Sequence, residues 1–221
     1  MKTRIEKLCA YLEKCKTFSD VGCDHGYCTR YMVENGLCES AVISDISAKS
    51  LKKAEILLEK YMSSGIVNSV CCNGLEGVAP SSLTLIAGMG GEEIINVLTA
   101  GYIPEKFVFQ PMKNAEKLRS YLLENGCNLT ADDLFFADGK YYFVIKGEKI
   151  GGCEKYSDKE LKFGRHSLKN REILGYINQE REKIETYLLN DLSEQTKRLM
   201  LRQITYLTEI ENECKRNFSL S

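Results

Sequence analysis

The sequence predicts an α/β protein with a Rossmann-like parallel sheet, an antiparallel hairpin at the end of that sheet, and a C-terminal helical hairpin. Strand-like apolar runs alternate with helical patterns over about the first 126 residues, which is typical of a parallel sheet covered by helices on both faces. Two further strand-like runs flank Asp138-Gly139, a dipeptide that favours a tight turn. Beyond Gly151-Gly152 the chain is rich in Lys, Glu and Leu and shows helical periodicity.

The order of the elements follows from periodicity and capping signals. The parallel part is expected to contain a helix at 4–15, a strand at 17–22, a helix at 27–35, a strand at 40–44, a helix at 47–62 capped by Ser47, strands at 66–72 and 83–87, a helix at 92–98, a strand at 107–109 and a helix at 114–124. The hairpin strands are expected at 129–136 and 141–146.

The tail is expected to fold as two antiparallel helices separated near Asn190-Asp191, with Asp191 or Ser193 as the cap of the second helix. The apolar seams that would pack together are Ile173, Ile177, Ile184 and Leu188 on one helix and Leu199, Ile204, Leu207 and Ile210 on the other. We therefore predict two domains: residues 1–150 form the ligand-binding domain, and residues 151–221 form a helical coiled coil.

Composition narrows the class of protein. The 221 residues carry a net charge of −1, so a nucleic-acid partner would have to be held by a local basic patch. The N-terminus begins an amphipathic pattern without an apolar leader, and no apolar run is long enough to span a bilayer, so we expect a cytoplasmic protein with no membrane partner. The 10 cysteines are scattered and only 2 histidines are present, which favours buried thiols in a reducing cytosol over disulfides or a metal site.

The most informative stretch is Asp20-Val21-Gly22-Cys23-Asp24-His25-Gly26-Tyr27, between the first strand and the second helix. Glycines here let the backbone come close to a nucleotide-like ligand, and the helix N-terminus offers free N–H groups. Asp24 stands where a glycine-rich phosphate loop usually has another glycine. Because a carboxylate repels phosphate and attracts a cation, the loop favours the sulfonium cofactor S-adenosylmethionine over a dinucleotide.

Other strand ends carry further candidates. Asp45 ends the second strand, where an acidic side chain accepts the ribose hydroxyls of a nucleoside, although a plain turn residue is the alternative. Asn73-Gly74 follows the next strand and either contacts an adenine ring or forms an ordinary turn. Gly88-Met89-Gly90-Gly91 leaves a slot at the edge of a central strand, and a flexible strand-to-helix turn is the alternative. Gln110-Pro111 ends the strand after it, where the Gln110 amide either pairs with a base edge or belongs to a structural turn.

His25 and Tyr27 have both structural and functional interpretations. A lone histidine is more often structural, but this one lies in the loop, and Tyr27 could stack on a base or pack the first helical turn. Basic residues gather before the helical hairpin, where a solvated face is the alternative to a phosphate-binding patch. This basic cluster contains Lys155, Lys159, Lys162, Arg165, Lys169 and Arg171.

Three segments in this order resemble the bacterial tRNA (adenine-N1)-methyltransferase family: the loop at 20–27, Ile86-Ala87-Gly88-Met89-Gly90-Gly91, and Gln110-Pro111. The resemblance covers about the first 150 residues closely and the two-helix tail less specifically. It implies a class I fold, which characteristically ends its sheet with a reversed strand. It also implies S-adenosylmethionine as the cofactor and adenine 22 of tRNA as the acceptor.

The expected roles combine the residues with this resemblance. Asp24, His25 and Tyr27 are the expected catalytic residues, with Asp24 stabilising the positive charge that develops on adenine. The cofactor is expected to bind to Asp20, Gly22, Gly26, Asp45, Ile46, Asn73, Gly74, Gly88, Met89 and Gly90. The tRNA is expected to bind to Gly91, Gln110, Pro111, Lys155, Lys162, Arg165 and Lys169. No metal is expected, and a monomer is favoured.

Two alternatives stay open from the sequence. One is a methyltransferase for a small molecule or a protein, with the tail as a dimerisation coil. The other is a cofactor-binding scaffold that has lost catalysis.

Overall fold

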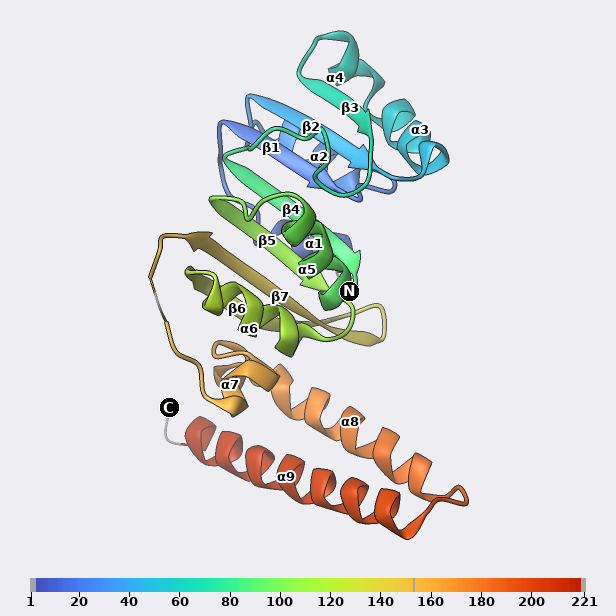
Figure 1. Ribbon diagram of the computed structural model, residues 1–221, viewed down its shortest axis with the longest axis vertical. Coiled ribbons are helices and arrows are strands. Elements are labelled where there is room, and N and C mark those ends of the chain that lie inside the picture. The colour runs from blue at the N-terminus through green and yellow to red at the C-terminus, as the bar shows by residue number, and fades with distance from the viewer. Residues whose placement is uncertain (1–2, 153, 220–221) are drawn as a thin grey trace. The chain divides into compact units, whose positions relative to one another are not determined.

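The computed structural model describes residues 3–152 and 154–219 (Figure 1). The outermost residues of the two predicted domains, 1–2 and 220–221, and residue 153 lie outside this described part. The chain divides into two compact units, Met1–Gly164 and Arg165–Ser221. No helix in the described residues is long and apolar enough to cross a membrane.

The first unit is built on a seven-stranded sheet with the order β3-β2-β1-β4-β5-β7-β6. Strands β1 to β5 are parallel, whereas β7 runs antiparallel to both β5 and β6. The predicted class I sheet with a reversed hairpin is therefore confirmed. The strands are β1 (Thr17–Val21), β2 (Ser40–Asp45), β3 (Val67–Cys71), β4 (Leu83–Met89), β5 (Lys106–Pro111), β6 (Cys127–Ala137) and β7 (Lys140–Lys149).

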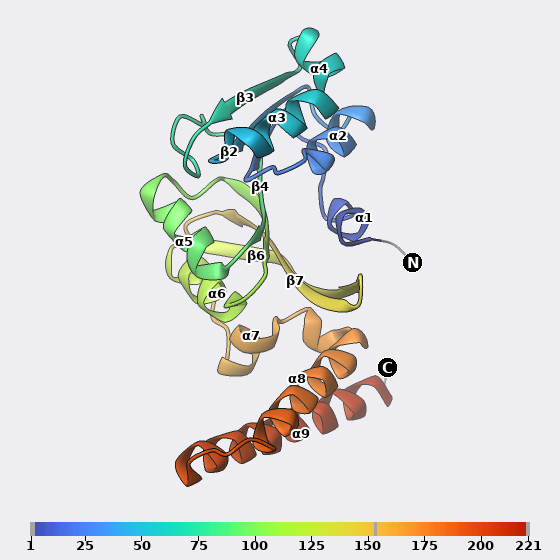
Figure 2. The same ribbon diagram turned by 90° about the vertical axis from the view of Figure 1, so that its right-hand side faces the viewer.

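Helices cover both faces of the sheet, as Figure 2 shows, with α1, α2 and α3 on one face and α5 and α6 on the other. Leu85 and Ile86 are neighbours on β4, yet they belong to the two different apolar clusters, because successive strand side chains point to opposite faces. The helices of this unit are α1 (Arg4–Cys9), α2 (Tyr27–Glu34), α3 (Ala48–Leu57), α4 (Glu59–Ser63), α5 (Gly91–Ala100), α6 (Ala115–Glu124) and α7 (Asp158–Phe163).

Two predicted helices are shorter than expected. The helix predicted over residues 4–15 ends at Cys9, after which the amides of Tyr11 and Leu12 donate to carbonyls only three residues back. The helix predicted over 47–62 breaks at Leu58, a fully buried side chain that separates α3 from α4. Ser47 caps α3 as predicted, since its hydroxyl accepts a hydrogen bond from the Ser50 amide.

The reversed hairpin turns at Asp138-Gly139, where both residues have positive φ, 48° and 78°. This conformation matches a two-residue hairpin turn whose twist fits the flanking strands. The two strands are longer than predicted, because pairing extends from Ala137 and Lys140 to Cys127 and Lys149.

The first unit ends later than the predicted domain boundary at residue 150. Arg119 is fully buried and donates to the Asp132 carboxylate at 2.8 Å and to the carbonyls of Leu161 and Lys162 at 2.9 and 3.3 Å. These bonds tie the end of α7, a helix that the sequence analysis did not predict, to α6. The division therefore falls after Gly164 in the structure.

The second unit contains η1 (Ser167–Lys169), α8 (Glu172–Leu188) and α9 (Glu194–Ser219). The two long helices lie side by side in both views (Figures 1 and 2), and Arg181 on α8 pairs with Glu211 on α9 at 2.6 Å. Ser193 is the cap, with its hydroxyl accepting from the Thr196 amide.

The prediction that Leu199 belongs to the apolar seam of the second unit is wrong. Leu199 is 53% exposed, whereas Leu207 and Ile210 are buried. Counting back four residues from Ile204 reaches Met200, which is half-buried and takes the seam position instead.

The buried pair between Arg119 and Asp132 gives a stability prediction. Replacing Arg119 by Met is expected to lower the free energy of unfolding by about 3–5 kcal/mol, because it breaks a buried ion pair and leaves the Asp132 carboxylate in the core without the Arg119 guanidinium. The double variant Arg119→Met/Asp132→Leu is expected to recover most of that loss, since both members of the buried pair are then replaced by apolar groups. Urea denaturation measures both, and a loss below about 1 kcal/mol in the single variant would contradict the pairing.

Candidate functional site

The turn that joins β1 to α2 is held against the end of β2 by its own backbone. The amides of Gly22 and Cys23 both donate to the Ser44 carbonyl, at 2.8 and 3.0 Å. Gly22 and Gly26 have φ values of 72° and 73°, a region that glycine adopts without steric cost. The glycines of the motif are therefore needed for the path of the backbone.

Asp24 also has a positive φ, 47°, which is unusual for a residue with a side chain. Its amide donates to the Asp45 carboxylate at 3.1 Å, and this bond fixes the strained conformation. The Asp24 side chain is left 67% exposed, 3.8 Å from the imidazole of His25. Backbone strain of this kind concentrates at functional sites, so the position of Asp24 supports a role for its carboxylate.

Asp45 organises this part of the site. One carboxylate oxygen accepts from the Asp24 amide, and the other accepts from the Ser47 amide at 2.8 Å. Each oxygen keeps a further lone pair for a ligand hydroxyl. The next residue, Ile46, leaves 71% of its surface exposed beside the carboxylate. A sugar with an attached base would meet a hydrogen-bond acceptor and an apolar surface here.

Asp20 lies at the end of β1 and is 5% exposed. Burial raises the pKa of its carboxyl to about 6, against the opposing effect of a 2.8 Å hydrogen bond from the Thr29 hydroxyl. Asp20 therefore exchanges a proton near neutral pH, and a nearby cation would favour its ionised form.

His25 and Tyr27 form a stacked pair at the rim. Their ring centroids lie 5.5 Å apart with an angle of 18° between the planes. Tyr27 is half exposed, so one aromatic surface faces solvent beside the loop. Such a surface is suited to stacking against a nucleobase.

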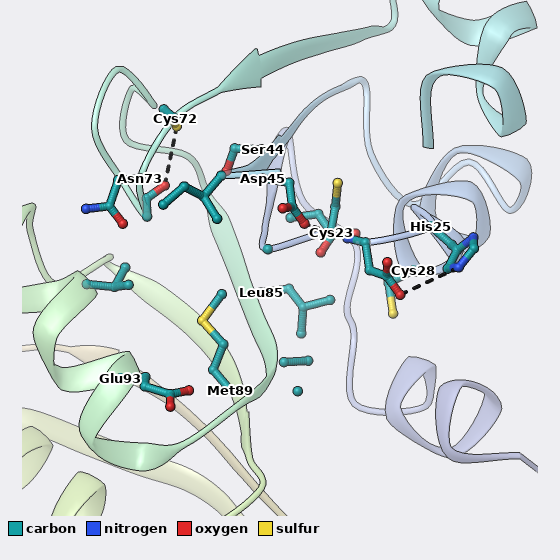
Figure 3. A pocket seen from close by; sticks show the side chains of 18 of the residues that line it. Cys23, His25, Cys28, Ser44, Asp45, Cys72, Asn73, Leu85, Met89 and Glu93 are labelled. Atoms are coloured by element: carbon teal, nitrogen blue, oxygen red, sulfur yellow. Dashed lines mark hydrogen bonds and ion pairs between the residues drawn. The ribbon is translucent and has the colours of Figure 1, made fainter. Parts of the chain in front are cut away.

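These groups line one cavity of about 840 Å³, a size that fits a cofactor-sized ligand. Figure 3 shows Cys72 and Asn73 on one side of this cavity, Asp45 and Cys23 in the middle, and His25 and Cys28 on the other side. The cavity brings together eleven of the predicted residues: Asp20, Gly22, Asp24, His25, Tyr27, Asp45, Ile46, Asn73, Gly74, Gly88 and Met89.

Several predicted glycines lie outside the cavity wall. Gly26 packs α2 on α3, because a Cβ there would lie 3.0 Å from that of Ala54. Gly91 is buried against the Asn114 carbonyl, which a Cβ would approach to 2.3 Å, and Gly90 is the N-cap of α5 and lies beside the Lys113 side chain. Close packing accounts for Gly26 and Gly91.

Gln110 and Pro111 also lie outside the cavity wall, and Gln110 is fully buried. Its amide nitrogen donates to the Pro111 carbonyl at 3.1 Å, and its amide oxygen accepts from Arg4 at 2.8 Å. Direct pairing of Gln110 with a base would require these bonds to break.

The predicted basic residues are divided between the two units. Lys155 and Lys162 belong to the first unit, and Arg165 and Lys169 belong to the second. None of them lines the cavity.

Several residues that line the cavity were not predicted from the sequence. Arg4, Ile5 and Leu8 come from α1, which was predicted only as an amphipathic helix. Glu93 and Val97 come from α5, which directly follows the glycine slot in the chain. The helical periodicity identified the buried faces of these helices but could not indicate which turns reach a ligand site.

The residues fit the predicted cofactor. Gly22, Gly74 and Gly88 line the cavity with positive φ and no side chain, which leaves their backbone open to a ligand. Added Cβ atoms at Gly22 and Gly74 would lie 2.2 Å from Met89 and 2.9 Å from Val97. Asp20, Asp24 and Asp45 suit a cation that carries ribose hydroxyls. Among the described residues, no three His, Cys, Asp or Glu side chains are grouped to hold a metal ion.

Residues 1–145 match the family model of the methyltransferase domain. A Mycoplasma pneumoniae protein named as a tRNA methyltransferase is 31% identical over 75% of this chain and 80% of its own length. The chain belongs to the tRNA methyltransferase family. A Bacillus subtilis tRNA (adenine(22)-N(1))-methyltransferase is 27% identical over 67% of this chain and 65% of its own length. The resemblance drawn from the motifs is confirmed.

The fold of this tRNA methyltransferase agrees with a solved structure. Sp1610 of Streptococcus pneumoniae, named as a tRNA (m1A22) methyltransferase and crystallised with S-adenosyl-L-methionine, superposes with a TM-score of 0.83. It is 24% identical, and the match covers 94% of this chain and 98% of that one. The similarity therefore includes the tail as well as the sheet.

The ionisation of Asp20 predicts a pH-dependent affinity. Binding of S-adenosylmethionine is expected to strengthen with rising pH, with an inflection near 6, because the ionised carboxylate attracts a cation and the protonated form does not. The free energy of unfolding of the ligand-free protein is expected to fall as the pH rises from about 4 to about 6. In this range the unfolded chain has already released the proton that buried Asp20 still holds.

Isothermal titration calorimetry from pH 5 to pH 8 measures the affinity. The Asp20→Asn variant keeps an acceptor for Thr29 but does not titrate, so its affinity should vary much less over this range. Equal pH dependence in the two proteins would contradict the assignment.

Proposed function

We infer that this protein transfers a methyl group from S-adenosylmethionine to N1 of adenine 22 in tRNA. The observation that carries the inference is the acid-bearing loop: Asp24 is held in a strained conformation over a cavity lined by Asp20 and Asp45. The name of the Bacillus subtilis relative supports the acceptor, and the complex of the pneumococcal structure supports the cofactor.

When bound, S-adenosylmethionine supplies an electrophilic methyl group on a sulfonium. Adenine N1 carries an in-plane lone pair, so no residue has to remove a proton before the attack. The residues must instead align the base and stabilise charge, because the N1-methylated base is a cation. Asp24 is assigned the charge-stabilising role, since its exposed carboxylate lies at the loop and its position is fixed through Asp45.

The acceptor base has to leave its stack or pair to reach the cavity, at a cost of about a few kcal/mol. The exposed face of Tyr27, backed by His25, offers a stacking surface that offsets part of this cost. Asp45, Ile46 and Asn73 are assigned to the ribose and adenine of the cofactor. This division leaves the rim at Tyr27 for the tRNA base.

Arg165 and Lys169 of the second unit, together with Lys155 and Lys162 near the end of the first unit, are assigned to tRNA binding through phosphate contacts, and the helical tail is assigned to recognition of tRNA shape. The same proposal places the enzyme in the cytoplasm and treats it as a monomer. Binding through phosphates makes the affinity for tRNA fall steeply with salt.

Labelled methyl transfer tests the function. Unmodified tRNA incubated with the enzyme and methyl-labelled cofactor is expected to yield N1-methyladenosine as the labelled nucleoside. A tRNA with guanosine at position 22 serves as the matched control and should stay unlabelled. Label on protein or on a small molecule, with none in tRNA, would instead support the alternative methyltransferase.

The role of Asp24 gives a kinetic prediction. Asp24→Asn is expected to lower the rate of methyl transfer at saturating cofactor on the order of 10²-fold, because a neutral amide cannot balance the charge on the base. Asp24→Gly should lose a similar factor while raising the melting temperature, since glycine relieves the positive φ. Single-turnover kinetics and thermal denaturation separate the two effects, and wild-type rates in Asp24→Asn would remove the charge-stabilising role.

A further inference from the structure

One cation stands among the acids of the cavity. Arg4 is the only Lys or Arg among the described residues that line it, whereas four carboxylates do so. These carboxylates belong to Asp20, Asp24, Asp45 and Glu93. A positive charge in the cavity wall would repel a sulfonium, unless the ligand also carries an anionic group that pairs with this charge.

Neutral groups hold the Arg4 side chain in place. Its guanidinium donates to the Gln110 amide oxygen at 2.8 Å and lies 5.9 Å from the centre of the Tyr142 ring. No ion pair joins it to a carboxylate in the described part of the chain. A half-buried guanidinium with one neutral acceptor keeps both its charge and several donors for a ligand.

The backbone of Arg4 is fixed as firmly as its side chain. A capping box between Thr3 and Glu6 begins α1, and the Arg4 amide donates to the Asp138 carboxylate at 2.9 Å. Asp138 belongs to the tight turn of the β6–β7 hairpin, so the reversed end of the sheet anchors this residue. An arginine ordered in this way loses little conformational entropy when it binds an anion.

The proposed cofactor carries one anion. Its amino-acid end combines an ammonium group with a carboxylate, while its sulfonium and ribose match the aspartates already described. We propose that Arg4 binds the carboxylate of S-adenosylmethionine, as a partner for the aspartates that attract the positive groups. The proposal rests on the proposed function, because it assumes this cofactor.

The position of Arg4 agrees with this assignment. It lies beside Gly88, where an added Cβ would be 3.4 Å from a guanidinium nitrogen, and it belongs to α1, which packs against α2, the helix that carries Cys28. Cys28 and Asn73 lie on opposite sides of the cavity in Figure 3, and Asn73 is assigned to the adenine. Arg4 therefore lies toward the end of the cavity opposite Asn73, which is the end left for the amino-acid part of the cofactor. Gln110, predicted to bind a base, acts instead as a positioning residue for Arg4.

Two ligands that differ in one group provide the test. S-adenosylmethionine and its decarboxylated analogue share the sulfonium, the amine and the nucleoside, and only the first has the carboxylate. Calorimetry should show that the wild-type protein prefers S-adenosylmethionine by about 10-fold or more, the range for hydrogen bonds between charged groups. Arg4→Met should reduce this preference to within about threefold, and Arg4→Lys should keep part of it.

Arg30→Met is the matched control. It removes the same charge from α2, where Arg30 pairs with Glu34 on the surface and does not line the cavity, so the ligand preference should persist. Gln110→Leu keeps Arg4 but removes its acceptor, and it should lower the preference part of the way. Melting temperatures verify that each variant is folded.

The possible results distinguish a failure of the Arg4 proposal from a failure of the proposed function. An unchanged preference in both Arg4 variants would overturn the Arg4 proposal. So would an unchanged preference combined with a raised KM for tRNA, which would assign Arg4 to a phosphate of the nucleic acid. A wild-type protein that binds neither ligand would refute the proposed function itself.

Discussion

The turn from Gly22 to Gly26 is the constraint on which the rest of the site depends. Three of its residues adopt positive φ within five positions, and the turn stays in place because its amides bind the Ser44 carbonyl and the Asp45 carboxylate. This arrangement couples the ends of two neighbouring parallel strands. A change in either strand end would therefore alter the position of Asp24 as well as its own ligand contacts.

The turn also determines how charge is distributed. Asp20 is buried, Asp45 is half-buried and Asp24 is exposed, so the three carboxylates that line one cavity differ in their access to water. Burial disfavours the ionised form of Asp20 relative to an exposed carboxyl, whereas the exposed carboxylate of Asp24 is accessible to a charge that forms later. In the proposed function, this difference in exposure assigns Asp20 and Asp45 to cofactor binding and Asp24 to stabilisation of the methylated base.

Much of this site could be predicted from the sequence, because strand ends are local features. Asp20, Gly22 and Asp45 follow apolar runs directly, and parallel strands bring such positions to one edge. Arg4 could not be found in this way, since its role depends on contacts with Gln110 and Asp138, more than a hundred residues away in the chain.

The remaining differences have physical causes that periodicity does not record. The predicted long helix is interrupted at the buried residue Leu58, where φ is −104° and ψ is 9°. The buried guanidinium of Arg119 binds carbonyls at the end of α7 and so joins this helix to the first unit. Gly91 reads as part of a ligand slot in the sequence, yet packing against the backbone of Asn114 accounts for it. In each case a distant contact decides what a local pattern leaves open.

Primer extension on unmodified tRNA tests the central claim most directly. A methyl group on adenine N1 blocks base pairing, so reverse transcription after incubation with enzyme and S-adenosylmethionine should stop immediately on the 3′ side of adenine 22. The stop should require the cofactor and should weaken strongly with Asp24→Asn. Full-length extension through adenine 22, under conditions in which the cofactor is shown to bind, would contradict the account.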